Sequence, residues 1–225
     1  MSPEISDREG AGTSGALWLR ALLLCLAVAV CYANSLQVPF LLDDPFGGHG
    51  QADIRFDYST RPLVWASFDL NRALAGRETW SFHVFNALVH LACGFLLLGV
   101  LRRTMSHVAP RLSARTRDEL AFITTLLWSC HPLQTAAVTY VSQRAEMMGA
   151  LFYLLVLYAF LGTSSAPRPM RWQALALLSL ALGLAAKETV ATAPLALLLY
   201  DGLFLTPGLL AALRRRRGFY GSVAL

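Results

Sequence analysis

Residues 82–101 read FHVFNALVHLACGFLLLGVL, and this apolar run decides the fold because it is long enough to cross a bilayer as one helix. A similar run, ALWLRALLLCLAVAVCYANS, covers residues 16–35. Of the 225 residues, 56% are hydrophobic and only 15% are charged, whereas soluble domains carry about 25% charged residues. The composition therefore indicates an integral membrane protein and excludes a soluble globular domain.

Basic residues cluster in short segments next to apolar runs, at 102–119, 162–171 and 214–217. The positive-inside rule places such segments in the cytoplasm, so the net charge of +5 sets orientation and does not indicate nucleic-acid binding. We expect an all-α membrane protein, a polytopic bundle of about six transmembrane helices with both termini cytoplasmic. Residues 1–15 are then a cytoplasmic tail, and residues 16–225 form the transmembrane domain.

The later apolar runs are interrupted by turn signals. His131-Pro132 breaks the third run, because proline removes a donor and disfavours helix at the preceding residue. The apolar part before this break is short, so we expect the crossing to continue into residues 133–141, and the chain to return from about Glu146 to Leu161. The last two runs, 172–186 and 189–205, meet at Lys187-Glu188.

Residues 36–81 form a long first loop on the extracytoplasmic face. Gly47-Gly48-His49-Gly50 predicts an irregular turn within it. Between Arg61 and Trp80, apolar residues recur near helical spacing with charges between them. This pattern predicts a short amphipathic helix lying in the membrane interface.

This topology brings acids and bases from three hairpins to the extracytoplasmic face. Carboxylates held at a membrane surface beside apolar residues tend to have raised pKa values and can act as bases, and cations nearby can stabilise a phosphate leaving group. Such residues are either a catalytic site or solvated loop ends and helix caps, and the Asp-Asp-Pro sequence by itself also fits a turn. The candidates are Asp43, Asp44, His131, Arg144, Glu146, Lys187 and Glu188.

Polar residues recur on one face of the 82–101 helix at His83, Asn86 and His90. Polar side chains in a membrane helix face either a neighbouring helix, through hydrogen bonds, or a wet cavity. No carboxylate or further histidine lies at ligand spacing, and the four cysteines contain no Cys-x-x-Cys motif. We therefore expect no metal and no cofactor.

Six motifs occur in a fixed order along the chain, and together they resemble the amino-terminal membrane region of the tetratricopeptide-repeat O-mannosyltransferase-like proteins. These are GT-C-type glycosyltransferases. The resemblance covers about residues 30–205 and indicates a bacterial member, so the implied location is the inner membrane with the site facing the periplasm. The motifs are Tyr32-Ala-Asn-Ser-Leu, Phe40-Leu-Leu-Asp-Asp, Ser59-Thr-Arg-Pro-Leu, Phe82-His-Val-Phe-Asn-Ala-Leu-Val-His, His131-Pro-Leu-Gln-Thr-Ala-Ala-Val-Thr-Tyr-Val-Ser-Gln-Arg-Ala-Glu and Ala186-Lys-Glu-Thr.

The resemblance implies transfer of a sugar, such as mannose, from a polyprenyl-phosphate donor to a hydroxyl of a protein or glycan acceptor, with inversion and without a metal. By analogy with the acidic first-loop motif of GT-C enzymes, Asp43 is the implied base and Asp44 its alternate or partner. Lys187 and Arg144 are the implied contacts of the lipid phosphate. The further substrate-binding candidates are His131, His83, Glu146 and Glu188.

The sequence also departs from the family pattern. The family continues through more membrane helices and then helical repeats of about 34 residues; no such repeat is present, so we expect an incomplete transmembrane domain. Two other function classes stay open, a non-catalytic membrane scaffold such as a truncated paralogue, and a small transporter using Lys187-Glu188 and His83/His90 as a path. A transporter predicts internal repeats with broken helices in matching positions, and the sequence shows none that is convincing.

Overall fold

The computed structural model describes residues 3–40, 44, 59–165 and 169–223, and this part of the chain is helical with no strand. Asp43 and the turn predicted at residues 47–50 lie outside the described residues.

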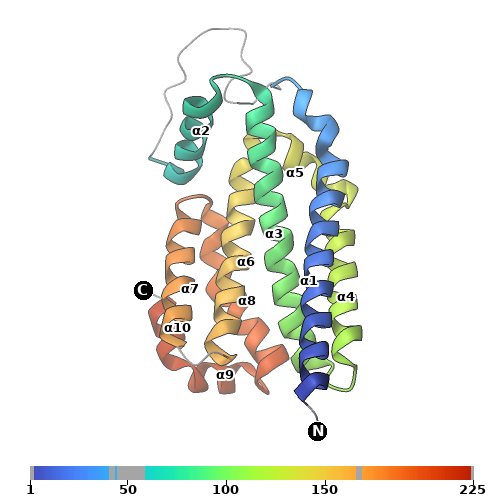
Figure 1. Ribbon diagram of the computed structural model, residues 1–225. Coiled ribbons are helices and arrows are strands. Elements are labelled where there is room, and N and C mark those ends of the chain that lie inside the picture. The colour runs from blue at the N-terminus through green and yellow to red at the C-terminus, as the bar shows by residue number, and fades with distance from the viewer. Residues whose placement is uncertain (1–2, 41–43, 45–58, 166–168, 224–225) are drawn as a thin grey trace.

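Three long helices set the axis of the bundle: α1 (Pro3–Tyr32), α3 (Thr79–Val108) and α6 (Arg144–Ser165). Figure 1 shows α4 (Ala114–Ser129) running beside α1, and α7 (Pro169–Leu184) running beside α6. Helix α4 begins where the Ser113 hydroxyl accepts the backbone N–H of Thr116 at 3.1 Å, the usual way to satisfy an orphan donor at a helix start.

Within the described residues, four segments are long and apolar enough to cross a membrane: Leu17–Gln37, Thr79–Val108, Val141–Thr163 and Glu188–Leu205. Large apolar side chains on the outside of the bundle, such as Leu22 and Leu88, are more than half exposed and need a lipid surface to cover them. The prediction of an all-α membrane protein is confirmed. The two other expected crossings contain α4 and α7, which have 16 residues each, so the count of six stays a prediction.

One end of the bundle, called here the α2 end, carries α2 (Pro62–Ala75) and the 3-10 turn η1 (Ala33–Gln37). Helix α2 occupies most of the stretch in which the sequence predicts an amphipathic helix. It has Pro62 in its first turn, where the missing N–H costs nothing. It stops at Gly76, whose φ of 63° suits glycine.

The predicted break after the third run is also at the α2 end. Helix α4 ends at Ser129, and Pro132 begins a separate turn after the extended residue His131. The expected continuation of one crossing helix through residues 133–141 is wrong, because three short elements fill this connection before α6. They are η2 (Pro132–Gln134), α5 (Thr135–Thr139) and η3 (Val141–Gln143).

The carboxyl-terminal part packs against α6 and α7. After α7 the chain turns at Lys187 and re-enters the bundle as one helical segment that changes pitch along its length. Its elements are η4 (Glu188–Thr192), α8 (Ala193–Tyr200) and the π-helical η5 (Asp201–Leu205). After the non-helical residues 206–208, the chain forms two separate short helices, α9 (Leu209–Arg215) and α10 (Arg217–Val223).

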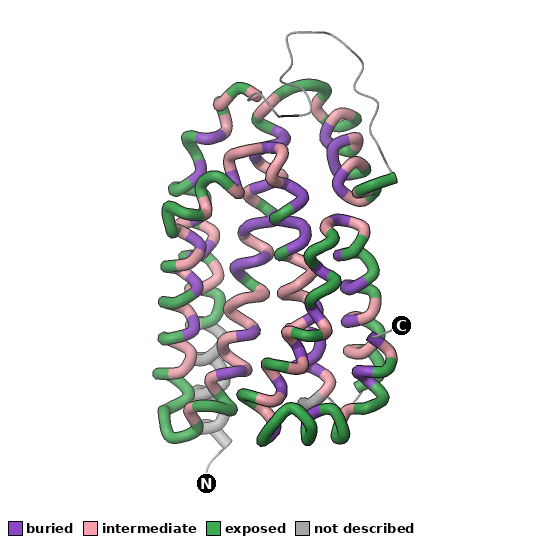
Figure 2. The backbone as a smooth tube through the Cα atoms, turned by 180° about the vertical axis from the view of Figure 1, so that it is seen from behind, coloured by how far each residue is buried: buried purple, intermediate pink, exposed green. Residues whose placement is uncertain are grey.

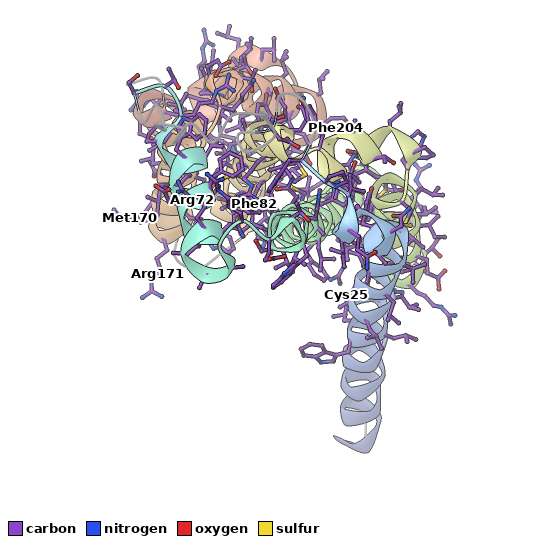
Figure 3. All side chains as sticks on the ribbon, turned by 90° about the horizontal axis from the view of Figure 1, so that it is seen from above. Cys25, Arg72, Phe82, Met170, Arg171 and Phe204 are labelled. Carbon is purple, nitrogen blue, oxygen red and sulfur yellow. The ribbon has the colours of Figure 1, made fainter. Side chains whose placement is uncertain are left out.

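Buried residues recur along the helices between exposed and intermediate ones, as the colours of the tube in Figure 2 show. At the α2 end, Val64 and Phe68 of α2 pack with Phe82 of α3, and Figure 3 shows Phe82 between these two helices. The backbone N–H of Leu63 also donates to the carbonyl of Ala185 at 3.2 Å. Helix α2 therefore closes over the end of α7 as well as packing against α3.

Candidate functional site

Asp44 is fastened to η3, the 3-10 turn that leads directly into α6. Its Oδ1 accepts the backbone N–H of Ser142 at 2.8 Å, and the residue is only 6% exposed. Unpaired N–H groups and the positive end of the helix dipole favour a carboxylate at this position. The contact spans 98 residues of sequence and joins the first loop to η3. Asp44 therefore has an anchoring role, and Asp43 lies next to this anchor in sequence.

A second set of contacts holds the beginning of the same loop. His83 of α3 lies 3.0 Å from the carbonyl of Val38 through its Nε2 and is 1% exposed. The ring of Phe40 meets Phe82 edge-on with a centroid separation of 5.3 Å. Val38 and Phe40, which precede Asp43 in the sequence, and Asp44, which follows it, therefore each have a partner in the bundle.

Arg144, the first residue of α6, lies in a fully buried polar cluster. Its Nε donates to Asn86 Oδ1 at 2.9 Å, and its Nη1 donates to Asn71 Oδ1 at 2.7 Å and to Ser67 Oγ at 3.3 Å. Its Nη2 donates to the carbonyl of Phe82 at 3.1 Å. In the described part of the chain, no carboxylate pairs with this guanidinium.

Aromatic rings complete the surroundings of Arg144. The guanidinium carbon lies 4.3 Å from the ring centroids of both Phe68 and Phe85, where the negative ring face attracts a cation. The hydrogen bonds and rings come from α2 and α3, whereas the arginine comes from α6. The cluster therefore holds three helices together at the α2 end.

Lys187 lies at a different place and has different partners. Its Nζ is 2.6 Å from Glu146 Oε1 and 3.6 Å from Glu188 Oε1, and its side chain keeps 12% exposure. Arg61, just before α2, donates to both oxygens of Glu188, at 3.2 Å to Oε1 and 3.4 Å to Oε2. These contacts form one charged cluster of two acids and two bases. Its residues come from α6, from the connection between α7 and η4, and from the residue before α2.

A glycine of α6 makes room for the lysine. A Cβ built on Gly149 would lie 2.9 Å from the Cβ of Lys187, closer than such atoms approach. The backbone of α6 and the stem of Lys187 are therefore in direct contact, and the position of the ammonium group depends on the absence of a side chain at residue 149.

An apolar pocket of about 440 Å³ begins beside this charged cluster. Glu146 and Thr189 are among its lining residues, and so are Leu97 of α3, Trp128 of α4 and Leu154 of α6. A pocket with mainly apolar walls and an ion pair at its edge has the shape and chemistry to hold a chain with a charged head.

The remaining predicted candidates have structural partners. His131 is exposed at the start of η2, where its Nδ1 accepts the backbone N–H of Leu133 at 3.2 Å. Asn86 donates to the carbonyl of Val138, and His90 contacts the carbonyl of Ser129 at 2.9 Å. The polar face of α3 therefore makes the helix–helix hydrogen bonds that the sequence left as one of two alternatives.

Sequence reasoning missed two features of the charge pattern. Arg61 is one of several loop arginines in the sequence, and only the fold brings it to Glu188. Asp201 is fully buried, pairs with Arg216 at 3.1 Å, and accepts hydrogen bonds from Thr206 and Tyr220. Asp201 could have been found from the sequence, because an acid within an apolar run is unusual. Its partner Arg216 could not, because it is one of four consecutive arginines.

The fold and these clusters define the chain, over its described residues, as an all-helical membrane protein in which Arg144, Glu146, Lys187 and Glu188 are grouped at the α2 end. Comparison with known proteins gives a more specific likeness. The sequence is 29% identical over 206 residues to "Protein O-mannosyl-transferase Tmtc3" of Drosophila melanogaster, covering 76% of this chain and 22% of the relative.

Two further relatives carry the same description. "Protein O-mannosyl-transferase TMTC1" of Homo sapiens is 30% identical over 178 residues, covering 69% of this chain and 19% of the relative. "Protein O-mannosyl-transferase Tmtc2" of Drosophila melanogaster is 30% identical over 208 residues, covering 80% of this chain and 21% of the relative. The chain thus spans about a fifth of the length of these relatives. No protein-family model and no solved structure matches the sequence.

Proposed function

We propose that this chain carries the amino-terminal part of a membrane O-mannosyltransferase of the GT-C type, which moves mannose from a polyprenyl-phosphate donor to a protein hydroxyl. The observation that carries the proposal is the similarity to three proteins named O-mannosyl-transferases over at least 69% of this chain. The anchored acidic loop and the charged cluster beside an apolar pocket supply suitable chemistry.

The proposed topology has six crossings, with α4 and α7 completing the four longer spans. Helix α4 presents Leu120, Ile123 and Leu127 outward, each at least 41% exposed, as a lipid-facing helix does. The α2 end then faces the extracytoplasmic side and the arginine-rich connection between α3 and α4 faces the cytoplasm.

In the proposed reaction, Asp43 takes the proton of the acceptor hydroxyl as its oxygen attacks the anomeric carbon. The bond from that carbon to the phosphate oxygen breaks, its electron pair stays on the lipid phosphate, and the configuration inverts. Asp44 holds the loop through Ser142, so that Asp43 is presented to the acceptor.

Lys187 is the proposed phosphate contact, and the lipid chain is proposed to enter the pocket beside Glu146. An ammonium group has three donors, and only Glu146 Oε1, at 2.6 Å, lies within hydrogen-bond distance, whereas Glu188 Oε1 lies at 3.6 Å, so donors remain for a phosphate oxygen. Arg144 is assigned instead to fixing α2, α3 and α6, because its nitrogens donate to protein groups and it is fully buried.

The test is mannose transfer by the 225-residue chain reconstituted in liposomes, with a polyprenyl-phosphate mannose donor and a serine- and threonine-containing peptide. Asp43→Asn is expected to lower the rate about a hundredfold or more, the contribution typical of a general base. Asp69→Asn is the matched control, since Asp69 is a partly exposed acid of α2 in an i,i+3 pair. Unchanged transfer in Asp43→Asn refutes Asp43 as the base, and a wild-type chain that neither binds the donor nor transfers mannose supports the scaffold hypothesis.

A further inference from the structure

The opposite end of the bundle contains a second pocket, of about 440 Å³, which the proposed transfer reaction does not use. It lies where α3 ends and α4 begins, with Tyr158 of α6 as one wall. Figure 1 places this α3–α4 connection at the far end of the bundle from α2. Its charged lining residues are Arg102, Arg103, Arg117 and Asp118.

The pocket has an excess of positive charge. Asp118 forms salt bridges with Arg102, at 2.8 and 3.1 Å, and with Arg20, at 3.3 Å. Arg103 and Arg117 have no carboxylate partner in the part of the chain that the structure describes. Each instead donates through Nη1 to backbone carbonyls, Arg103 to Tyr158 at 2.8 Å and Arg117 to Leu112 at 3.0 Å. Their other nitrogens are left for a ligand.

Aromatic packing fixes the direction of Arg103. Its guanidinium carbon lies 3.9 Å from the ring centroid of Tyr158 and 5.1 Å from that of Trp172. The ring of Tyr158 in turn packs on the backbone of α3 at Gly99, where an added Cβ would come within 2.6 Å of it. A guanidinium held in this way loses little side-chain freedom when it binds an anion.

The pocket also lies at a height suited to a lipid headgroup. Arg102 and Arg103 are in the last turns of the segment Thr79–Val108 that is apolar enough to span a bilayer. Tyrosine and tryptophan side chains are typical of the membrane–water interface. Basic pockets between transmembrane helices at this level bind the phosphates of acidic lipids.

We propose that this pocket, formed by Arg102, Arg103 and Arg117 with Tyr158, binds the headgroup phosphate of an anionic glycerophospholipid. The site is independent of the mannosyltransferase proposal, since none of its residues belongs to the α2 end. Arg103 and Arg117 supply the free cationic donors, and Arg102 is held in place by Asp118.

The test is a titration of the purified chain, in a neutral detergent, with short-chain phosphatidylglycerol, followed by native mass spectrometry. Short-chain phosphatidylcholine and inorganic phosphate are titrated in parallel. The variants are Arg103→Gln, on α3, and Arg117→Gln, on α4. Arg115→Gln is the matched control, because Arg115 lies two residues from Arg117, is 86% exposed and pairs with Glu119.

The expected result is binding of phosphatidylglycerol in preference to both comparators, weakened about fivefold in each pocket variant and unchanged in Arg115→Gln. Arg117→Gln keeps the test decisive if Arg103→Gln does not fold, since Arg103 also packs between rings. Equal loss in Arg115→Gln, or wild-type affinity in both pocket variants, overturns the proposal. Competition by inorganic phosphate at the concentration at which the lipid binds overturns the assignment to a lipid.

Discussion

Arg144 and Lys187 are two cations close to the start of α6 that differ in their burial and in their partners. Arg144 has neutral hydrogen-bond partners, aromatic walls and no exposure. Lys187 has acidic partners, some exposure and an apolar pocket beside its ion pair. The family resemblance implies both as contacts of the lipid phosphate. The difference in burial and partners assigns the arginine to architecture and leaves the lysine as the candidate for binding.

The largest effect is expected from Arg144→Met. The substitution leaves the side chains of Asn71 and Asn86 without their guanidinium partner in a buried place, where each unsatisfied group costs about 1–3 kcal/mol. We expect a loss of about 3 kcal/mol or more, measured by thermal or denaturant unfolding in detergent micelles. Arg72→Gln, at a partly exposed residue of α2, is the control. Equal stability of the two variants removes the architectural role of Arg144.

A smaller effect is expected from Gly149→Ala. The added Cβ forces Lys187 away from α6, and overpacking of this kind costs about 1–3 kcal/mol. The same unfolding measurement applies, with Gly218→Ala as the control because an added Cβ there meets nothing within 4 Å. A Gly149→Ala protein as stable as the control shows that the contact between Lys187 and α6 is loose.

The smallest effect is expected from Arg61→Gln, which breaks the pair with Glu188. The two side chains are 37% and 69% exposed, and pairs of this kind contribute about 0–1 kcal/mol. Unfolding free energies of this variant and wild type are expected to agree within about 1 kcal/mol. A loss as large as that of Arg144→Met contradicts the view that the Lys187 cluster contributes little to stability.

The sequence was sufficient for much of the fold and for only part of the site. Apolar runs of membrane-spanning length predicted the helices, and Pro132 predicted the break after α4, because both signals are local. The grouping of Lys187, Glu188 and Glu146 followed from topology, since hairpin ends on one side of a membrane meet. The position of a residue along the chain was thus enough to predict at which end of the bundle it lies.

The sequence did not show in which direction each side chain points, and therefore which partner it reaches. Arg144 and Glu146 are two residues apart, so they point to different sides of the start of α6, one into a buried cluster and one toward Lys187. Asn71 and Arg61 acquire their partners only when α2 folds back over α3 and α7. The pairing of Asp201 with Arg216 likewise needs the carboxyl-terminal helices to pack.

The central claim is that Lys187, and not a residue chosen by charge alone, contacts the donor phosphate. The most direct measurement compares binding of polyprenyl-phosphate mannose to wild type, Lys187→Met and Arg61→Gln by native mass spectrometry. We predict about tenfold weaker binding for Lys187→Met, since a charge-assisted hydrogen bond contributes about 1.5–3 kcal/mol, and near wild-type binding for Arg61→Gln. A folded Lys187→Met protein that binds the donor as tightly as wild type contradicts the claim.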